Sequence, residues 1–151
     1  MDRPRWRFTI HYRLHQRLQV GAEINPAAAE IGPLFSLFIL TESAWRPALF
    51  IGTSSDRIGS PEGTQSYFLT AAKFLPVALL SIYASLNYSE WDEGFNFPFG
   101  VNFEMGRGFS TRYMFDGDRS HVLLNYFGNR CGISLMYIWL ETFGISLNVG
   151  L

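Results

Sequence analysis

The sequence predicts an all-β protein, an antiparallel up-and-down transmembrane β-barrel of about 10–12 strands. Apolar and polar residues alternate along most of the chain, as in residues 97–103, where Phe97, Phe99, Val101 and Phe103 are separated by small or polar residues. Strands sort residues of period two onto two faces, whereas a helix spreads them to all sides. Tight turns and longer loops also alternate along the chain, which is typical of barrels that cross a membrane.

Counting the segments gives eleven strands. They cover residues 5–14, 18–25, 34–41, 47–53, 65–74, 77–89, 96–105, 109–116, 121–127, 132–140 and 144–151. Single-chain bacterial barrels have an even number of strands, so we expect a twelve-strand plan that lacks its first strand, or a ten-strand barrel in which one apolar segment does not span. In the twelve-strand plan, the free edges at 5–14 and 145–151 pair directly or through a partner strand or oligomer.

Composition narrows the class of protein. The 151 residues suit one domain, residues 1–151. A net charge of −1 gives no basic stripe for nucleic acid. Aromatic and charged residues each make up 17% of the chain, and charge below the usual level of about 25% suits a surface that faces lipid. The single cysteine, Cys131, excludes an internal disulfide and a multi-cysteine metal site. We expect no metal and no cofactor.

The start of the chain and its apolar stretches bear on its location. Residues 1–4 run straight into a patterned segment without a secretory leader. The longest charge-free stretch, 74–89, contains Pro76 and several polar residues, and it falls short of the ~20 apolar residues of a spanning helix. We therefore expect a porin-like protein of the bacterial outer membrane, with its signal peptide removed, in contact with the lipid bilayer and lipopolysaccharide.

Three features favour lipid outside and water inside. The polar face carries few charges, and the chain has one lysine, Lys73, where a soluble surface would have many. Aromatic residues gather near strand ends, as at membrane interfaces, and residues 145–151 alternate up to an apolar end. The candidate lumen-lining residues are Arg7, His11, Arg13, Glu23, Asn102, Glu104 and Arg112. The candidate interface aromatics are Trp6, Tyr12, Trp45, Tyr88, Trp91, Tyr113 and Trp139.

One stretch resembles a known family. Glu42, 46–49, Gly52-Thr53, Asp56, Ile58-Gly59, Tyr67 and 71–73, preceded by 18–21, follow the pattern of YjbH-type outer-membrane barrel domains, which are associated with exopolysaccharide export. The likeness covers about a third of the chain. It implies an outer-membrane barrel with a polar lumen and no catalytic residue. The leading strand of that family has no counterpart here, in agreement with the odd strand count.

The sequence leaves several functions open. The first is a membrane scaffold or narrow pore without catalysis, in which Arg7, Arg13 and Arg112 pair with Glu23, Glu104 and Asp116 and fill the lumen or select what passes. A soluble lipocalin-like barrel that binds a ligand on an inward apolar face is the main alternative. An envelope-lipid hydrolase using Ser120-His121 with Asp116 or Asp118, and an engineered barrel without a natural role, are the others. The loop around 59–63, with Asp56 and Arg57, is expected to be a mobile surface loop.

Overall fold

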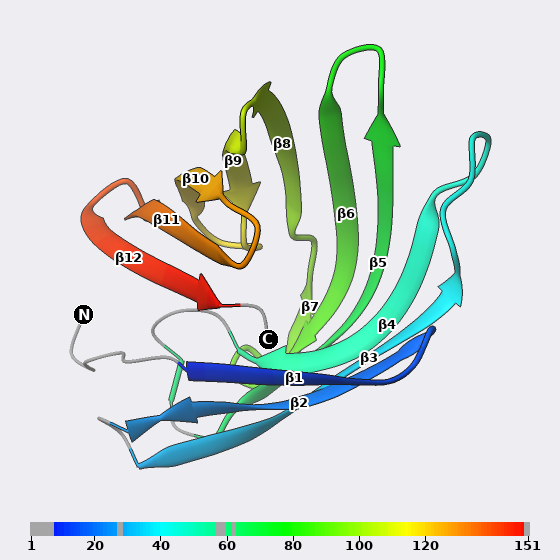
Figure 1. The fold of residues 1–151 in the computed structure, drawn as a ribbon. Helices are drawn as coiled ribbons and strands as arrows, with labels where there is room; N and C mark the ends of the chain where they lie inside the picture. Colours follow the sequence, from blue (N-terminus) through cyan, green and yellow to red (C-terminus); the bar gives the residue numbers. More distant parts are fainter. Residues whose placement is uncertain (1–7, 27–28, 57–59, 62, 150–151) are drawn as a thin grey trace. The chain divides into compact units, whose positions relative to one another are not determined.

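The computed structural model describes residues 8–26, 29–56, 60–61 and 63–149. These ranges form twelve β-strands and no α-helix. The strands are β1 (Phe8–His15), β2 (Leu18–Asn25), β3 (Glu30–Leu40), β4 (Ala48–Ser55), β5 (Gln65–Leu75), β6 (Leu80–Ser89), β7 (Gly94–Asn96), β8 (Phe99–Gly106), β9 (Phe109–Phe115), β10 (Ser120–Phe127), β11 (Cys131–Ile138) and β12 (Thr142–Val149) (Figure 1). The prediction of an all-β, antiparallel, up-and-down fold is confirmed.

The hydrogen-bonded order of the strands follows the chain. It runs from β1 to β6 and then from β8 to β12, while β7 lies off this path and pairs with β6. The path starts at β1 and ends at β12, and among the described residues no pairing joins these two strands, so the sheet is not closed into a barrel.

The twelfth strand comes from a break inside a predicted one. The sequence predicts one strand over 96–105, but β7 ends at Asn96 and β8 starts at Phe99. Pro98 lies between them, and a proline has no N–H to donate to a β-ladder. β6 therefore pairs with β7 at one end and with β8 at the other. The start of the predicted strand 5–14 lies outside the described residues.

The connection between β2 and β3 is shorter than expected. The sequence suggests a long loop over 25–32, yet Asn25 pairs with Glu30 and Ile24 pairs with Ile31. Only residues 26–29 connect the two strands, and Ala29 adopts a positive φ of 53° there. The contrast between turns and loops is thus weaker than predicted, because the connection 41–47, which the alternation predicts to be a short one, is longer than 26–29.

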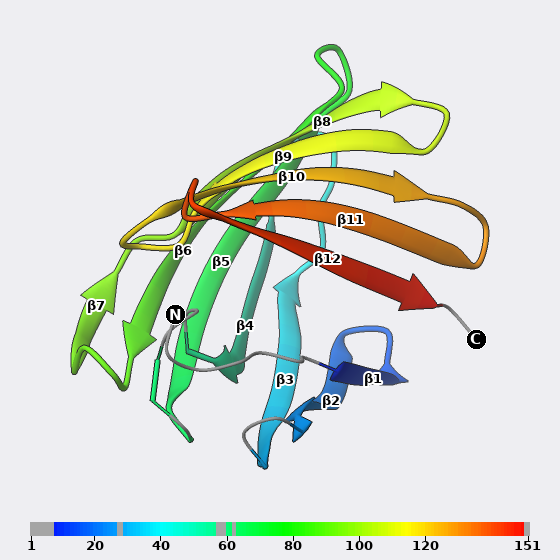
Figure 2. The same ribbon diagram turned by 90° about the vertical axis from the view of Figure 1, so that its left-hand side faces the viewer.

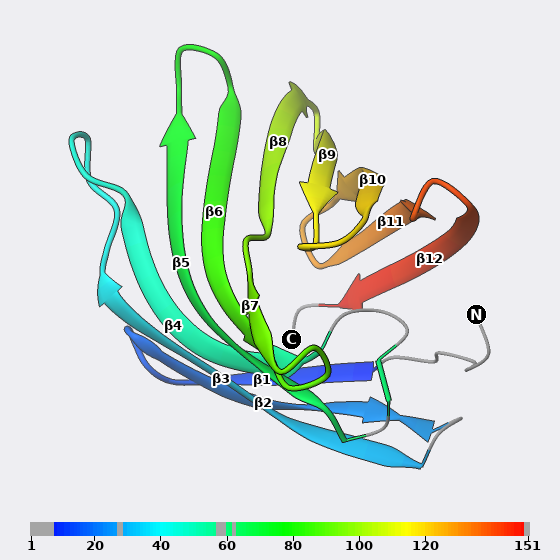
Figure 3. The ribbon, with the colours of Figure 1, turned by 180° about the vertical axis from the view of Figure 1, so that it is seen from behind.

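Contacts divide the chain into two compact units, and each is described by itself. The first comprises Met1–Ala71 and Ser85–Asn96, and the second comprises Ala72–Ala84 and Phe97–Leu151. In the first unit, β1, β2 and β3 lie side by side as hairpin-linked strands (Figure 3). In the second unit, β8 to β12 form a continuous meander (Figure 2).

Both units bury few apolar side chains. The buried hydrophobic residues of the described chain are Leu34 and Ala48. A small aromatic cluster adds to them in the first unit, where the ring centroids of Phe38 and Phe50 are 5.1 Å apart and those of Phe50 and Phe68 are 6.1 Å apart. A conventional apolar core is therefore small.

Aromatic rings cover glycines on neighbouring strands. A Cβ added at Gly52 would lie 2.2 Å from the Phe35 carbonyl oxygen and 2.6 Å from Cζ of Phe68. At Gly100, a Cβ would lie 2.5 Å from Cε1 of Tyr83, the residue paired with it on β6. The ring occupies the space that a side chain would take, so both positions require glycine.

Candidate functional site

The two faces of the sheet have the reverse of the usual polarity. Phe97, Phe99 and Phe103 are exposed by 66%, 43% and 44%, whereas Asn102, between the last two, is 8% exposed. We call the face that carries these phenylalanines the apolar face and the opposite one the polar face. Other exposed residues of the apolar face are Phe8, Ile10, Tyr12, Leu14, Tyr67, Leu69, Ile82, Leu86, Val122, Leu124, Ile133, Leu135, Phe143, Ile145, Leu147 and Val149.

Small polar residues fill the polar face and bond to one another. Buried members include Asn25, Ser66, Thr70, Asn87, Asn102, Ser110, Asn125 and Ser134. The hydroxyls of Thr70 and Ser85 are 2.7 Å apart, and those of Ser54 and Ser66 are 3.0 Å apart. Such cross-strand bonds satisfy polar groups that would be costly to bury alone.

The described candidate lumen residues lie on β1, β2, β8 and β9, but their pairing differs from the expectation. His11, Arg13 and Arg112 are exposed, and Glu23 and Glu104 are half-buried. Ser55 Oγ donates to Glu23 Oε1 over 2.5 Å, and Asn102 Nδ2 donates to Glu104 Oε1 over 2.6 Å.

Glu104 and Asp116 were expected to pair with arginines. Instead, Glu104 accepts from Asn102, and Asp116 pairs with a histidine. In both cases the partner, Asn102 or His121, is a residue that lies close to the carboxylate in the sheet. Arg7 lies outside the described residues.

Of the candidate interface aromatics, Tyr88 lies near the end of β6, Trp45 and Trp91 lie in connections, and Tyr12 and Tyr113 lie within β1 and β9. Tyr12, Trp45, Tyr88, Trp91 and Tyr113 are exposed, by 97% in the case of Trp45.

Trp139, in the β11–β12 turn, is half-buried, and the Arg119 guanidinium lies 4.5 Å from the centre of its ring. Trp6 lies outside the described residues.

A buried pair closes the β9–β10 connection of the second unit. His121 Nε2 and Asp116 Oδ2 are 2.8 Å apart, and their side chains are 6% and 11% exposed. The backbone N–H of Trp139 donates to His121 Nδ1 over 3.4 Å. Nδ1 is therefore an acceptor, and the ring proton on Nε2 is donated to Asp116. Both ring nitrogens are thus engaged.

Asp116 also caps the turn that follows it. Its Oδ1 accepts from the backbone N–H groups of Asp118 at 2.9 Å and Arg119 at 2.8 Å. Burial alone would raise the pKa of Asp116, but the hydrogen bond from His121 and these two backbone bonds outweigh it and hold the pKa below its ordinary value of 3.8.

The structure does not assemble the hydrolase arrangement considered from the sequence. Ser120 directly precedes His121 on β10, so the two side chains point to opposite faces. The Ser120 hydroxyl instead lies 2.8 Å from that of Tyr113. Asp116 and His121 therefore form a pair that Ser120 does not join.

A second carboxylate, in the first unit, has a role that the sequence did not indicate. Asp56 is 1% exposed, and its Oδ2 accepts from Ser89 Oγ at 2.7 Å and from the backbone N–H of Trp91 at 3.1 Å. Ser89 Oγ in turn accepts from the Asp92 N–H at 3.0 Å. Asp56 was expected to belong to a mobile surface loop, but its carboxylate is buried and bonds to Ser89 and Trp91, while residues 57–59 and 62 of that loop lie outside the described residues.

Comparisons with known proteins give no relative: no protein-family model, no curated protein and no solved structure matches the chain. Within the described ranges, no helix is both long enough and apolar enough to span a membrane. The same ranges contain no group of three or more histidine, cysteine or acidic side chains placed to hold a metal ion.

Proposed function

We propose that this protein is an integral β-barrel of the bacterial outer membrane that serves as a structural scaffold or a narrow pore. The reversed polarity of its sheet carries the proposal. Transfer of apolar surface out of water is favourable by roughly 25 cal/mol per Å², so a sheet that exposes phenylalanine, leucine and isoleucine on most of its strands gains free energy from a hydrocarbon surrounding.

Three strands have the length that this environment requires, while the other described strands have 3 to 8 residues. β3 and β5 have 11 residues each and β6 has 10. At about 3.3 Å per residue and a tilt of about 40°, such strands span roughly 25 Å, the height of the apolar band of outer-membrane barrels. Exposed aromatics at or just beyond strand ends, such as Trp45, Tyr88 and Trp91, fit the two interfaces of that band.

The filling of the polar face favours a scaffold or narrow pore over a wide channel. Its serine, threonine and asparagine side chains bond across strands and leave little free polar surface. A barrel in lipid must also satisfy its edges, so the proposal includes closure, either by direct pairing of β1 with β12 or through a further strand or partner.

The soluble lipocalin-like alternative requires the opposite polarity. Its apolar face would surround a ligand, and its polar face would meet water. Leu124 and Ile133 illustrate the difference, because they are 48% and 47% exposed while Asn125 and Ser134, next to them in the chain, are 3% and 5% exposed. The proposed link to polysaccharide export rests on the resemblance of the sequence to YjbH-type barrel domains.

Insertion into lipid tests the proposal. Leu124, on the apolar face of β10, changed to arginine should lower the free energy of unfolding in vesicles by about 2–4 kcal/mol if the residue lies near the bilayer midplane. The matched control, Asn129→Arg, lies in the β10–β11 turn and should cost about 0–1 kcal/mol.

Two outcomes would contradict the proposal. One is a chain that stays folded and monomeric in buffer without detergent. The other is an equal effect of Leu124→Arg and Asn129→Arg. Planar-bilayer recording addresses the lumen, and a large, stable open conductance would contradict the narrow pore.

A further inference from the structure

Two neighbouring turns in the second unit each carry an exposed arginine. Arg107 lies in the β8–β9 turn and Arg130 in the β10–β11 turn, and both side chains are exposed. The Phe127 N–H donates to the Gly108 carbonyl oxygen over 2.8 Å, which joins the two turns. Two positive charges therefore lie at the same end of β8 to β11.

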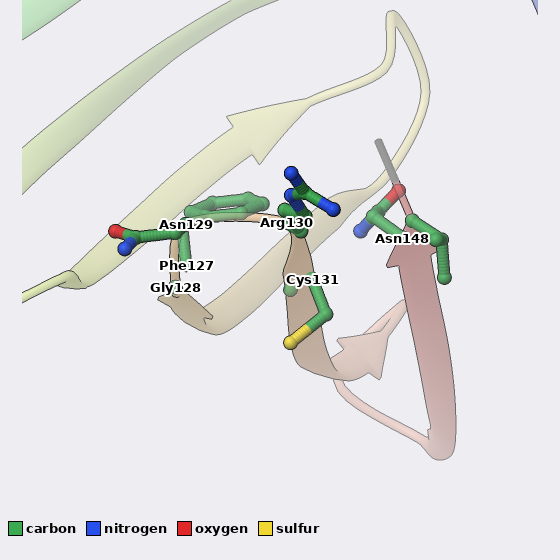
Figure 4. Close-up of a pocket in the computed structure, with 8 residues that line it drawn as sticks. Phe127, Gly128, Asn129, Arg130, Cys131 and Asn148 are labelled. Atoms are coloured by element: carbon green, nitrogen blue, oxygen red, sulfur yellow. The ribbon is translucent and has the colours of Figure 1, made fainter. Parts of the chain in front are cut away.

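Arg130 borders a hollow. The cavity has a volume of about 320 Å³ and is lined by residues 127–132 together with Asn148 and Val149 of β12 (Figure 4). Figure 4 shows Arg130, Cys131 and Asn148 among the side chains that line this hollow. A guanidinium beside an open hollow matches the oxygens of a phosphodiester.

The apolar face continues directly from this hollow. Cys131 pairs with Val149, and Ile133 pairs with Leu147. Ile133, Leu147 and Val149 are exposed by 47%, 74% and 75%. A ligand with a phosphate at one end and hydrocarbon at the other would find both of its parts accommodated within a few residues.

The opposite end of the same unit has the opposite charge. Asp116, Asp118 and Glu141 lie in the β9–β10 and β11–β12 connections with Arg119 as their cation, and Arg119 lies 3.5 Å from Asp118 and 3.7 Å from Glu141. An anionic headgroup is repelled there and attracted to the end with Arg107 and Arg130.

We propose that the hollow beside Arg130 binds one anionic phospholipid. Its phosphate accepts hydrogen bonds from the Arg130 guanidinium in the turn, Arg107 adds a second positive charge, and the acyl chains lie along Ile133 and Leu147. The proposal rests on the proposed function, since it requires the apolar face to be in contact with lipid.

Native mass spectrometry of the full chain in detergent micelles tests it, with phosphatidylglycerol and phosphatidylcholine of the same acyl chains as probes. Phosphatidylglycerol should bind more tightly. Arg130→Gln should weaken its binding about fivefold, and Arg107→Gln with Arg130→Gln about 25-fold, on the basis of about 1 kcal/mol per basic residue near anionic lipid. Arg130→Lys should keep most of the affinity, because the charge remains.

Arg119→Gln, at the acidic end, is the matched control and should leave the affinity for phosphatidylglycerol unchanged. Bound phosphatidylglycerol should also slow the reaction of Cys131 with a maleimide, since this thiol is exposed and borders the hollow.

Equal binding of both lipids, equal loss in Arg119→Gln and Arg130→Gln, or equally tight binding of soluble glycerol phosphate would overturn the lipid site. A separate measurement reports on the proposed function itself. If urea extracts the chain from vesicles of either lipid, the protein is not integral to the bilayer.

Discussion

Asp56 in the first unit and Asp116 in the second occupy equivalent positions in the chain and act over different distances. Each directly follows a strand, β4 or β9, and each accepts hydrogen bonds that fasten a connection. Asp56 bonds to Ser89 and Trp91, 33 and 35 residues away, whereas the partners of Asp116 lie two to five residues away. The same residue type thus holds together distant segments in one unit and a single local turn in the other.

The largest expected loss of stability follows from a change at Asp56. Asp56→Ala removes the carboxylate that accepts from the buried Ser89 hydroxyl and from the backbone N–H of Trp91, so the free energy of unfolding should fall by about 3 kcal/mol. Urea unfolding in micelles, followed by tryptophan fluorescence, measures it. Asp56→Asn keeps one acceptor oxygen and is the matched control, with a smaller loss. A loss under about 1 kcal/mol for Asp56→Ala would show that the contact is dispensable.

Asp116→Ala should cost less, about 2 kcal/mol, because solvent and the turn itself can replace part of what is lost. The loss should be coupled to His121. In a double-mutant cycle with His121→Ala, measured by the same unfolding experiment, the double mutant should lose less unfolding free energy than the sum of the two single-mutant losses. Strict additivity would mean that the pair contributes nothing as a pair.

Acid should reduce the stability that Asp116 contributes. The pKa of Asp116 is below its ordinary value of 3.8 in the folded protein, so the unfolded chain binds more protons between the two pKa values. The stability that Asp116 contributes is complete above its unfolded pKa and is lost as pH falls through the folded pKa. The difference in unfolding free energy between wild type and Asp116→Asn should therefore shrink below about pH 4. A difference that stays constant down to the lowest pH would refute the assignment.

The smallest effect concerns the β11–β12 turn, to which His121 connects Asp116 through Trp139. Leu140 has a φ of 57° in this turn, a conformation that glycine adopts without strain. Leu140→Gly should raise the free energy of unfolding by about 0.5 kcal/mol. Leu135→Gly, in the extended part of β11, is the matched control and should lower it. A destabilising Leu140→Gly would mean that contacts of the leucine outweigh the strain.

The sequence predicted what repeats and missed what depends on distant partners. Period-two alternation located eleven strands and assigned Phe99 and Asn102 to opposite faces, because this pattern is local. Residues 116–119 also carry a local turn signal, since aspartate bonds to backbone N–H groups just after it.

The contacts of Asp56 with Ser89 and Trp91 had no such signal, because neither their spacing nor their composition marks the pairing. The early start of β3 at Glu30 was missed for the same reason, since its apolar pattern begins only at Leu34 and its pairing with Asn25 decides the boundary.

The rings over Gly52 and Gly100 affect how intolerance to substitution should be interpreted in this protein. A saturation screen would reject even alanine at both positions, as firmly as it would reject changes in a binding residue. The cause is steric, a methyl group forced into Phe68 or Tyr83 and a nearby carbonyl oxygen. Evolutionary invariance at these glycines would therefore mark places where the backbone supports a ring, and a search for the ligand should begin elsewhere.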